Sequence, residues 1–326
     1  MKDKELKNSQ QTTRVQNGTS EQQNIRPETF VTFMEKSISQ LRMMGKARTS
    51  DIYKCTLSSF LRFSSGKDIS FSDIDTDLIM RYEAHLLRDR GITRNSSSFY
   101  LRTFRATYNR AVAQGLTHDR HPFRYVYTGI DKTTKRALPL QLLRRIATLD
   151  LTSEPNLEKA RDLFLFSFYT RGMSFVDMAY LKKSDIANGT LVYRRRKTGQ
   201  ILQIKWEKCM QDIVDKYDND NNDYLLPIIN KENINKRQQY LSSIGYTNIL
   251  LKKIGFILDL QLPLTTYVAR HSWANIARFK NVPISIISEG MGHNSESTTR
   301  IYLSSLETHL VDNANSTILD ALLNNK

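Results

Sequence analysis

The sequence is poor in cysteine and has no long apolar segment. Its only cysteines, Cys55 and Cys209, are far apart and have no partners at metal-ligand spacing, which argues against a disulfide framework and a zinc site. No run reaches about 18 apolar residues, so no segment is predicted to span a membrane. The first residues are polar and lack the apolar core of a signal peptide. These absences predict a cytoplasmic protein.

Acidic residues are outnumbered by basic ones. Asp and Glu total 33 against 48 Lys and Arg, which gives a net charge of +15. Such a charge predicts a polyanionic partner, with nucleic acid as the leading candidate and a merely basic surface as the alternative. A membrane-surface protein would need an amphipathic Lys-rich helix or a polybasic cluster beside an anchor, and neither is present. The length of 326 residues suits two domains.

The N-terminal part divides into a polar tail and a helical region. Residues 1–26 are rich in Gln, Asn, Lys and Thr, and a segment of this composition is expected to stay flexible. Apolar residues then recur at helical spacing and predict four helices. The first predicted helix begins at Glu28 and ends before Gly45, and the other three span residues 50–63, 76–90 and 95–114. Residues 27–125 are therefore predicted to form a small basic helical domain.

Two arginines of the fourth predicted helix lie one turn apart. A helix that packs Phe104 and Tyr108 inward presents Arg102 and Arg105 outward, where both guanidinium groups can contact DNA phosphates. The helical pattern then fades, and residues 126–136 are predicted to be an interdomain linker. Basic residues in and before this linker are expected to lie against DNA, a solvated basic loop being the alternative: Arg124, Lys135 and Arg136.

Residues 137–326 are predicted to be mainly helical, with one interruption. The segments TLVYRRR and QILQIKW are rich in β-forming residues and flank Lys197, Thr198 and Gly199. This pattern predicts a β-hairpin with Lys197 at its tip. The expected fold class is therefore mainly α with a small β-sheet or hairpin.

Four places in this region carry residues suited to phosphate chemistry. An arginine follows the apolar helix DLFLFSFYT, a lysine stands at the hairpin tip, a second arginine lies within TTYVARHSWANIARF, and GMGHNSESTTRIYL holds a histidine nine residues before a tyrosine. Each place alone has an ordinary structural explanation, such as an arginine that complements a helix dipole. The residues are Arg171, Lys197, Arg270, His293 and Tyr302.

In this order, the residues resemble the motif set of the tyrosine recombinases, the family of phage-type integrases. The resemblance covers nearly all of the chain. It implies that residues 27–125 form a SAM-like core-DNA-binding domain and that residues 137–326 form the catalytic domain with a C-terminal tail. Arg171 then matches the first family arginine, Lys197 the hairpin lysine and Arg270 the second arginine. His293 matches the later His-or-Trp position, and Tyr302 the nucleophile.

One position departs from the family pattern. The family commonly has a histidine three residues before the second arginine, where this chain has Tyr267. The departure puts in doubt a histidine general base at this place, although Tyr267 stays a candidate for the site. His271 also matches a common family residue, and a structural role is expected for it.

The reaction implied by the resemblance is attack of the Tyr302 oxygen on a DNA phosphodiester. It leaves a 3′-phosphotyrosine and a free 5′-hydroxyl, and because the phosphoester energy is kept in the covalent intermediate, no cofactor is required. Arg171 and Arg270 would hold the non-bridging oxygens in place of a metal ion, and no metal site is expected. Lys197 would protonate the leaving 5′ oxygen. Either Tyr267 or His293 would accept the proton of Tyr302.

The implied partners are double-stranded DNA and three further copies of the chain in a tetramer. An apolar stretch near the C-terminus is expected to pack into a neighbouring protomer or, alternatively, onto its own domain. The short N-terminal tail favours an invertase, a resolvase or the integrase of a mobile element, and the need for an accessory DNA-bending protein stays open. Two other interpretations are a type IB topoisomerase-like nicking enzyme and a DNA-binding regulator that has kept only the fold.

Overall fold

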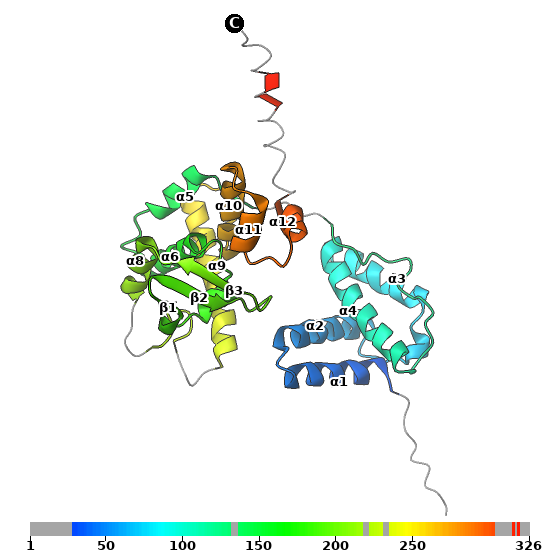
Figure 1. The fold of residues 1–326 in the computed structure, drawn as a ribbon. Coiled ribbons are helices and arrows are strands. Elements are labelled where there is room, and N and C mark those ends of the chain that lie inside the picture. Colours follow the sequence, from blue (N-terminus) through cyan, green and yellow to red (C-terminus); the bar gives the residue numbers. More distant parts are fainter. Residues whose placement is uncertain are drawn as a thin grey trace, which may run out of the picture. The chain divides into compact units, whose positions relative to one another are not determined.

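The computed structural model describes residues 28–131, 136–217, 222–230, 235–303, 315–316 and 318–319. Within these ranges, only the backbone of Tyr302 is described. The predicted tail 1–26, Lys135 and most of the predicted C-terminal tail lie outside this part. The chain divides into two compact units, Met1–Asp131 and Lys132–Lys326, which are described separately (Figure 1). None of the described helices is both long and apolar enough to cross a lipid bilayer.

The first unit is a helical bundle with an aromatic core. Its α-helices are α1 (Phe30–Met43), α2 (Ala47–Phe63), α3 (Thr76–Ala84) and α4 (Arg94–Ala113). Phe30 stacks on Phe104 with ring centroids 4.2 Å apart, and both side chains are fully buried. The four predicted helices are confirmed, with two differences. Helix α2 begins at Ala47, three residues before its predicted start, and α3 ends at Ala84 and continues as a π-helical turn over His85–Asp89.

Local sequence explains where α3 and α4 begin. The Asp75 carboxylate accepts a hydrogen bond from the Leu78 N–H at 2.8 Å, and the Thr93 hydroxyl accepts one from the Ser96 N–H at 3.3 Å. Such N-caps satisfy backbone donors that have no partner inside the helix. The cap on α4 helps to fix the helix whose outer face carries the predicted DNA-binding arginines.

The second unit is also mainly helical. Its helices are α5 (Leu140–Ala147), α6 (Pro155–Tyr169), α7 (Phe175–Ala179), α8 (Lys208–Tyr217), α9 (Lys236–Ile257), α10 (Thr266–Phe279), α11 (Ile284–Gly290) and α12 (Glu296–Leu303). Helix α6 is central, because it contacts α8, α9 and α10 (Figure 1). The first half of α6 is charged, whereas residues 163–167 are all buried, and Phe164 and Phe166 are fully buried among them. A helical segment that is buried on every side lies inside the core.

A small antiparallel sheet lies beside these helices. Its strands are β1 (Ile186–Ala187), β2 (Thr190–Arg194) and β3 (Ile201–Lys205), in that order. Leu191 pairs with Ile204 and Tyr193 with Leu202, and all four side chains are buried, whereas the residues between them along the strands, Val192 and Gln203, are exposed. The predicted hairpin and the mainly α fold class with a small sheet are confirmed. Strand β1 was not predicted, since two residues are too few to form a pattern.

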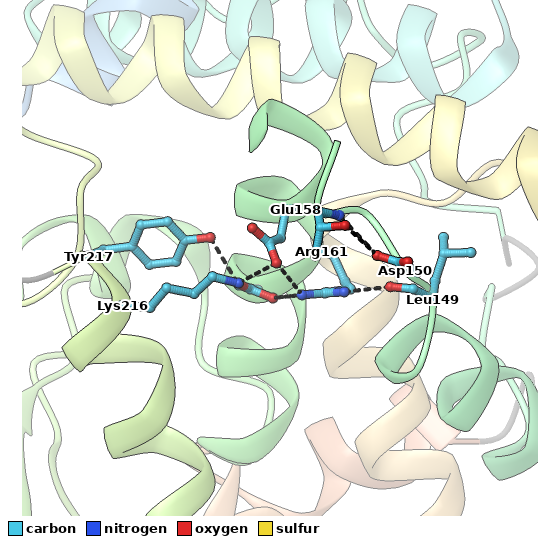
Figure 2. A network of polar contacts seen from close by, with 8 residues as sticks. Leu149, Asp150, Glu158, Arg161, Lys216 and Tyr217 are labelled. Atoms are coloured by element: carbon cyan, nitrogen blue, oxygen red, sulfur yellow. Dashed lines mark hydrogen bonds and ion pairs between the residues drawn. The ribbon is translucent and has the colours of Figure 1, made fainter. Parts of the chain in front are cut away.

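An ionic cluster around the buried Asp162 joins α6 to α8. The Asp162 carboxylate, whose side chain is 5% exposed, accepts hydrogen bonds from Lys216 Nζ at 2.9 Å and from the Tyr217 hydroxyl at 2.8 Å. Arg161 lies on the other side of the same carboxylate at 2.9 Å. Figure 2 shows Lys216 and Tyr217 reaching toward Glu158 and Arg161 of α6. The cluster fixes the end of α8, which follows the sheet directly in sequence.

Candidate active site

Arg171 stands in a tight turn at the end of α6. Its φ of 60° and that of Gly172, 73°, place two successive residues in the left-handed region. A non-glycine residue in this region is strained, and such strain tends to occur at functional sites. A Cβ built on Gly290, the last residue of α11, would lie 3.5 Å from Arg171 Cδ. The half-buried Arg171 side chain therefore reaches the C-terminal end of α11.

Arg270 lies in the middle of α10 and is 3% exposed. Its Nη1 donates a hydrogen bond to the Gly172 carbonyl at 2.7 Å, and its Nη2 donates to the Met291 carbonyl at 2.7 Å. These bonds hold the guanidinium between the turn that carries Arg171 and the turn that follows α11. The two predicted arginines, one at the end of α6 and one on α10, thus lie together at the end of α11.

His293 follows α11 and is brought against Arg270. Its Nε2 lies 3.2 Å from Arg270 Nη2, and its Nδ1 lies 2.7 Å from the Thr299 hydroxyl. Burial, with a smaller effect from the positive charges of Arg270, Arg195 and Lys197, lowers the pKa of His293 to about 4. The imidazole is therefore neutral at pH 7.

The β2–β3 hairpin supplies two further positive charges. Lys197 is exposed in the turn between the strands, and its charge acts on His293. Arg195 is 6% exposed, and its guanidinium donates a hydrogen bond to the Gly292 carbonyl. The hairpin is also held to α7, because the Asp177 carboxylate accepts a hydrogen bond from the Arg196 N–H at 2.8 Å.

Three arginines gather around one buried tyrosine of β2. Burial raises the pKa of Tyr193, and the Asp177 carboxylate raises it further. The positive charges of Arg270, Arg195 and Arg171 act in the opposite direction on the same hydroxyl. The site therefore has a concentrated positive charge, which suits a phosphate group bearing negative charge on its non-bridging oxygens.

Tyr302 lies on α12, the next helix after His293 in the chain. Its side chain is outside what the structure describes. The neighbouring side chains show how the helix is seated: Thr299 is fully buried, and Leu303, 2% exposed, joins an apolar cluster with Ala274 and Ile287. The backbone of Tyr302 is thus carried by a helix that packs against α10 and α11.

Tyr267 occupies a different environment from Arg270, although both lie on α10. Its side chain is 51% exposed, and its ring stands edge-on to His271 with centroids 4.8 Å apart. His271 is 7% exposed. The Tyr267 ring thus packs on the neighbouring histidine of its own helix, and its participation in the site stays a prediction.

The predicted DNA-binding residues lie in both units. In the first unit, Phe104 and Tyr108 are fully buried as predicted, Arg102 is half-buried and Arg105 is exposed. Arg105 and Arg124 line a shallow hollow of about 440 Å³ together with His121 and Phe123. In the second unit, Arg136 is exposed. Lys135 lies outside the described residues.

Sequence reasoning missed Arg195 and Thr299. The burial of Arg195 continues the two-residue alternation of Leu191 and Tyr193 along β2, so the strand pattern contained a signal for it. Thr299 had no such signal, because its role depends on a contact between a helix and a preceding turn. Within the described residues, no three His, Cys, Asp or Glu side chains are grouped so as to hold a metal ion.

Comparisons with known proteins show which sequences the chain resembles. Residues 29–127 match the family profile of the phage integrase SAM-like domain. The chain is 26% identical over 245 residues to the tyrosine recombinase XerA of Thermococcus kodakarensis, an alignment that covers 73% of this chain and 80% of that protein. The sequence similarity therefore extends beyond the first unit into the second.

Solved structures extend the similarity to the fold. A lambda integrase tetramer bound to a Holliday junction matches with a TM-score of 0.64 and 17% identity, covering 85% of this chain and 78% of that one. The XerH site-specific recombinase in a post-cleavage complex with a palindromic difH substrate matches with a TM-score of 0.61 and 18% identity, covering 87% and 83%. At these identities the matches establish a shared fold.

Proposed function

We propose that this chain, which its sequence similarity and fold identify as a member of the tyrosine recombinase family, cleaves and rejoins double-stranded DNA through a covalent bond to Tyr302. The observation that carries the proposal is the position of Arg171, Arg270 and His293. They belong to different helices or the turns after them, yet they lie together next to α12. The reaction is site-specific recombination, which integrates, excises or inverts DNA.

The chemistry begins with attack of the Tyr302 oxygen on the scissile phosphorus. The bond from phosphorus to the 5′ oxygen breaks as the bond to tyrosine forms, which leaves a 3′-phosphotyrosine and a 5′-hydroxyl. Arg171 and Arg270 hold the non-bridging oxygens, where negative charge develops, and loss of one such donor costs about 10²–10³ in rate. A 5′-hydroxyl of another strand then attacks the phosphotyrosine and releases the enzyme.

Two proton transfers accompany this exchange. Lys197 protonates the leaving 5′ oxygen, for which its place in an exposed turn beside His293 is suited. The second proton leaves Tyr302 as its oxygen attacks. With a pKa of about 4, His293 is a weak base, which favours a hydrogen-bonding role for the imidazole and a solvent water molecule as the acceptor of the Tyr302 proton. Tyr267, half-exposed on α10, is kept as a second hydrogen-bonding group near the site.

We assign DNA contacts mainly to residues 27–125, with residues 126–136 as the connection to the catalytic domain, 137–326. The hollow lined by Arg105 and Arg124 supports this assignment, because two guanidinium groups at one concave place suit a phosphate. The similar structures include a lambda integrase tetramer on a Holliday junction, and a homotetramer on paired sites is proposed for this chain by analogy. A DNA substrate also supports the cytoplasmic localisation that we propose.

A nicked suicide substrate tests the function. The duplex carries inverted repeats from the DNA that flanks the gene, with a nick beside the cleavage position so that the short 5′-hydroxyl fragment diffuses away. A recombinase becomes covalently trapped, whereas a regulator that has kept only the fold binds without an adduct. Strand exchange between two intact sites without the nick distinguishes a recombinase from a topoisomerase-like enzyme, which relaxes plasmids whether or not they carry the repeats.

A further inference from the structure

The hydroxyl of Thr299 links the helix of the nucleophile to the imidazole of the site. Thr299 lies on α12, three residues before Tyr302, and its Oγ1 is 2.7 Å from His293 Nδ1. The side chain is fully buried. A buried polar group of this kind is costly unless it is hydrogen-bonded, so the contact is part of the way in which α12 is held.

The contact of His293 Nε2 with Arg270 determines which imidazole nitrogen carries the proton. Arg270 Nη2, 3.2 Å from His293 Nε2, is a donor only, because a guanidinium has no acceptor. Nε2 must therefore accept, and in a neutral imidazole the proton is then on Nδ1. That proton points to the Thr299 oxygen, which gives a continuous path from Thr299 through His293 to Arg270.

The same helix face provides the second anchor of α12. Leu303, one turn beyond Thr299, is 2% exposed and packs in the apolar cluster with Ala274, Ile287 and Met291. Ile301 on the opposite side is 74% exposed. Thr299 and Leu303 thus define the inward face of α12, and the polar member of the pair is the one that reaches the histidine.

We propose that Thr299 is a positioning residue, which accepts a hydrogen bond from the Nδ1–H of His293 and holds the imidazole ring with Nε2 against Arg270, so that the ring helps to orient the Arg270 guanidinium. Because Thr299 is on the helix that carries Tyr302, the imidazole is set only when this helix is seated on the site. The position of α12, which carries the nucleophile Tyr302, and the orientation of the phosphate-binding Arg270 are in this way coupled. The catalytic consequence rests on the proposed recombinase function, whereas the tautomer does not.

The tautomer is tested by nitrogen-15 NMR of the histidine side chains in the full chain without DNA, with His293→Gln to identify the signal. Thr299→Val keeps the shape of the side chain and removes the hydroxyl, and Thr299→Ser keeps the hydroxyl. Thr298→Val is the matched control, since Thr298 is the exposed neighbour on the same helix. The wild type, Thr299→Ser and Thr298→Val should show Nδ1–H. In Thr299→Val the imidazole ring is no longer held with Nε2 against Arg270, so its tautomer should shift toward the Nε2–H form that a free neutral imidazole prefers. An unchanged tautomer in Thr299→Val overturns the proposal.

Single-turnover cleavage of the nicked substrate gives the second readout. Thr299→Val should cleave about tenfold more slowly, as expected for one hydrogen bond, while Thr299→Ser and Thr298→Val stay within about twofold of the wild type. Thr299→Ala removes the same hydroxyl and replaces the valine variant if that variant does not fold. A hydroxyl-free variant that cleaves at the wild-type rate contradicts the coupling. Absence of an adduct in the wild type would contradict the recombinase function alone, because the NMR measurement needs no DNA.

Discussion

Gly172 lies directly against the backbone of Arg270. The Gly172 carbonyl accepts a hydrogen bond from Arg270 Nη1 at 2.7 Å, and a Cβ built on Gly172 would lie 2.7 Å from Arg270 Cα. With a φ of 73°, the glycine also occupies a conformation that side chains disfavour. The turn that carries Arg171 can approach α10 this closely only because position 172 has no side chain.

Gly172→Ala should therefore displace the turn from α10 and separate the two arginines. The control is Gly189→Ala, because Gly189 has a φ of 70° and nothing within 4 Å of its built Cβ. Both variants bear the backbone strain, and only Gly172→Ala bears the clash. Denaturant unfolding should show Gly172→Ala to be about 2 kcal/mol less stable than the control, and its cleavage rate should fall with it. Equal stability of the two variants would mean that α10 moves to accommodate the added methyl group with no loss of free energy of unfolding.

The sequence predicted that the distant residues of the active site come together only because of their order along the chain. Arg171, Arg270 and His293 were identified by the spacing of known family motifs, and their contacts follow from the packing of α6, α10 and α11. Helical spacing alone was a weaker guide. It placed Tyr267 one turn from Arg270, yet Tyr267 is 51% exposed and Arg270 3%.

Residues whose role depends on tertiary contacts were not predictable. Arg195 is buried because the register of β2 with β3 turns it inward with Leu191 and Tyr193, whereas the sequence drew attention to exposed Lys197 in the same run of basic residues. Thr299 is one of two adjacent threonines, and only the position of His293 distinguishes it from Thr298. The end of α3 at Ala84 likewise had no clear marker in the sequence.

Lys197→Ala should slow cleavage of normal DNA by about 10²–10⁴-fold, because the leaving 5′ oxygen then lacks its proton donor. A substrate whose bridging 5′ oxygen is replaced by sulfur should largely rescue the variant, since a thiolate leaves without a proton. Single-turnover rates on the two substrates make the comparison. Lys205→Ala is the control, because Lys205 is a lysine at the other end of the same hairpin and its side chain is 80% exposed. Equal defects of Lys197→Ala on both substrates would assign the acid to another group.

His293 should make the stability of the second unit depend on pH. Its pKa is about 4 in the folded chain and about 6.5 in the unfolded chain, so between these values the unfolded chain binds more protons. The free energy of unfolding should therefore be highest above about pH 6.5 and fall as the pH is lowered toward 4. Urea unfolding at pH 7 and pH 5 measures the change. It should be smaller in His293→Gln, and an identical change in the variant would contradict a buried neutral imidazole.

Asp162→Asn should destabilise the junction of α6 and α8 shown in Figure 2. The substitution weakens charge-assisted hydrogen bonds to Lys216 and Arg161 at a carboxylate that is 5% exposed, and a loss of about 2–3 kcal/mol is expected. Asp212→Asn on α8 is the control, because its ion pair with Lys208 is exposed and should contribute about 0.5 kcal/mol or less. Thermal and denaturant unfolding compare the two. Similar losses would mean that the cluster adds no more than a surface pair.

The most direct test of the account is the identity of the nucleophile. On the nicked suicide substrate, the wild type should accumulate a covalent adduct, and peptide mapping should find the nucleotide on Tyr302. Tyr302→Phe lacks the attacking oxygen but keeps the aromatic ring, so it should bind the same DNA with similar affinity and form no adduct. An adduct that persists in Tyr302→Phe, or that maps to another residue, would contradict the account.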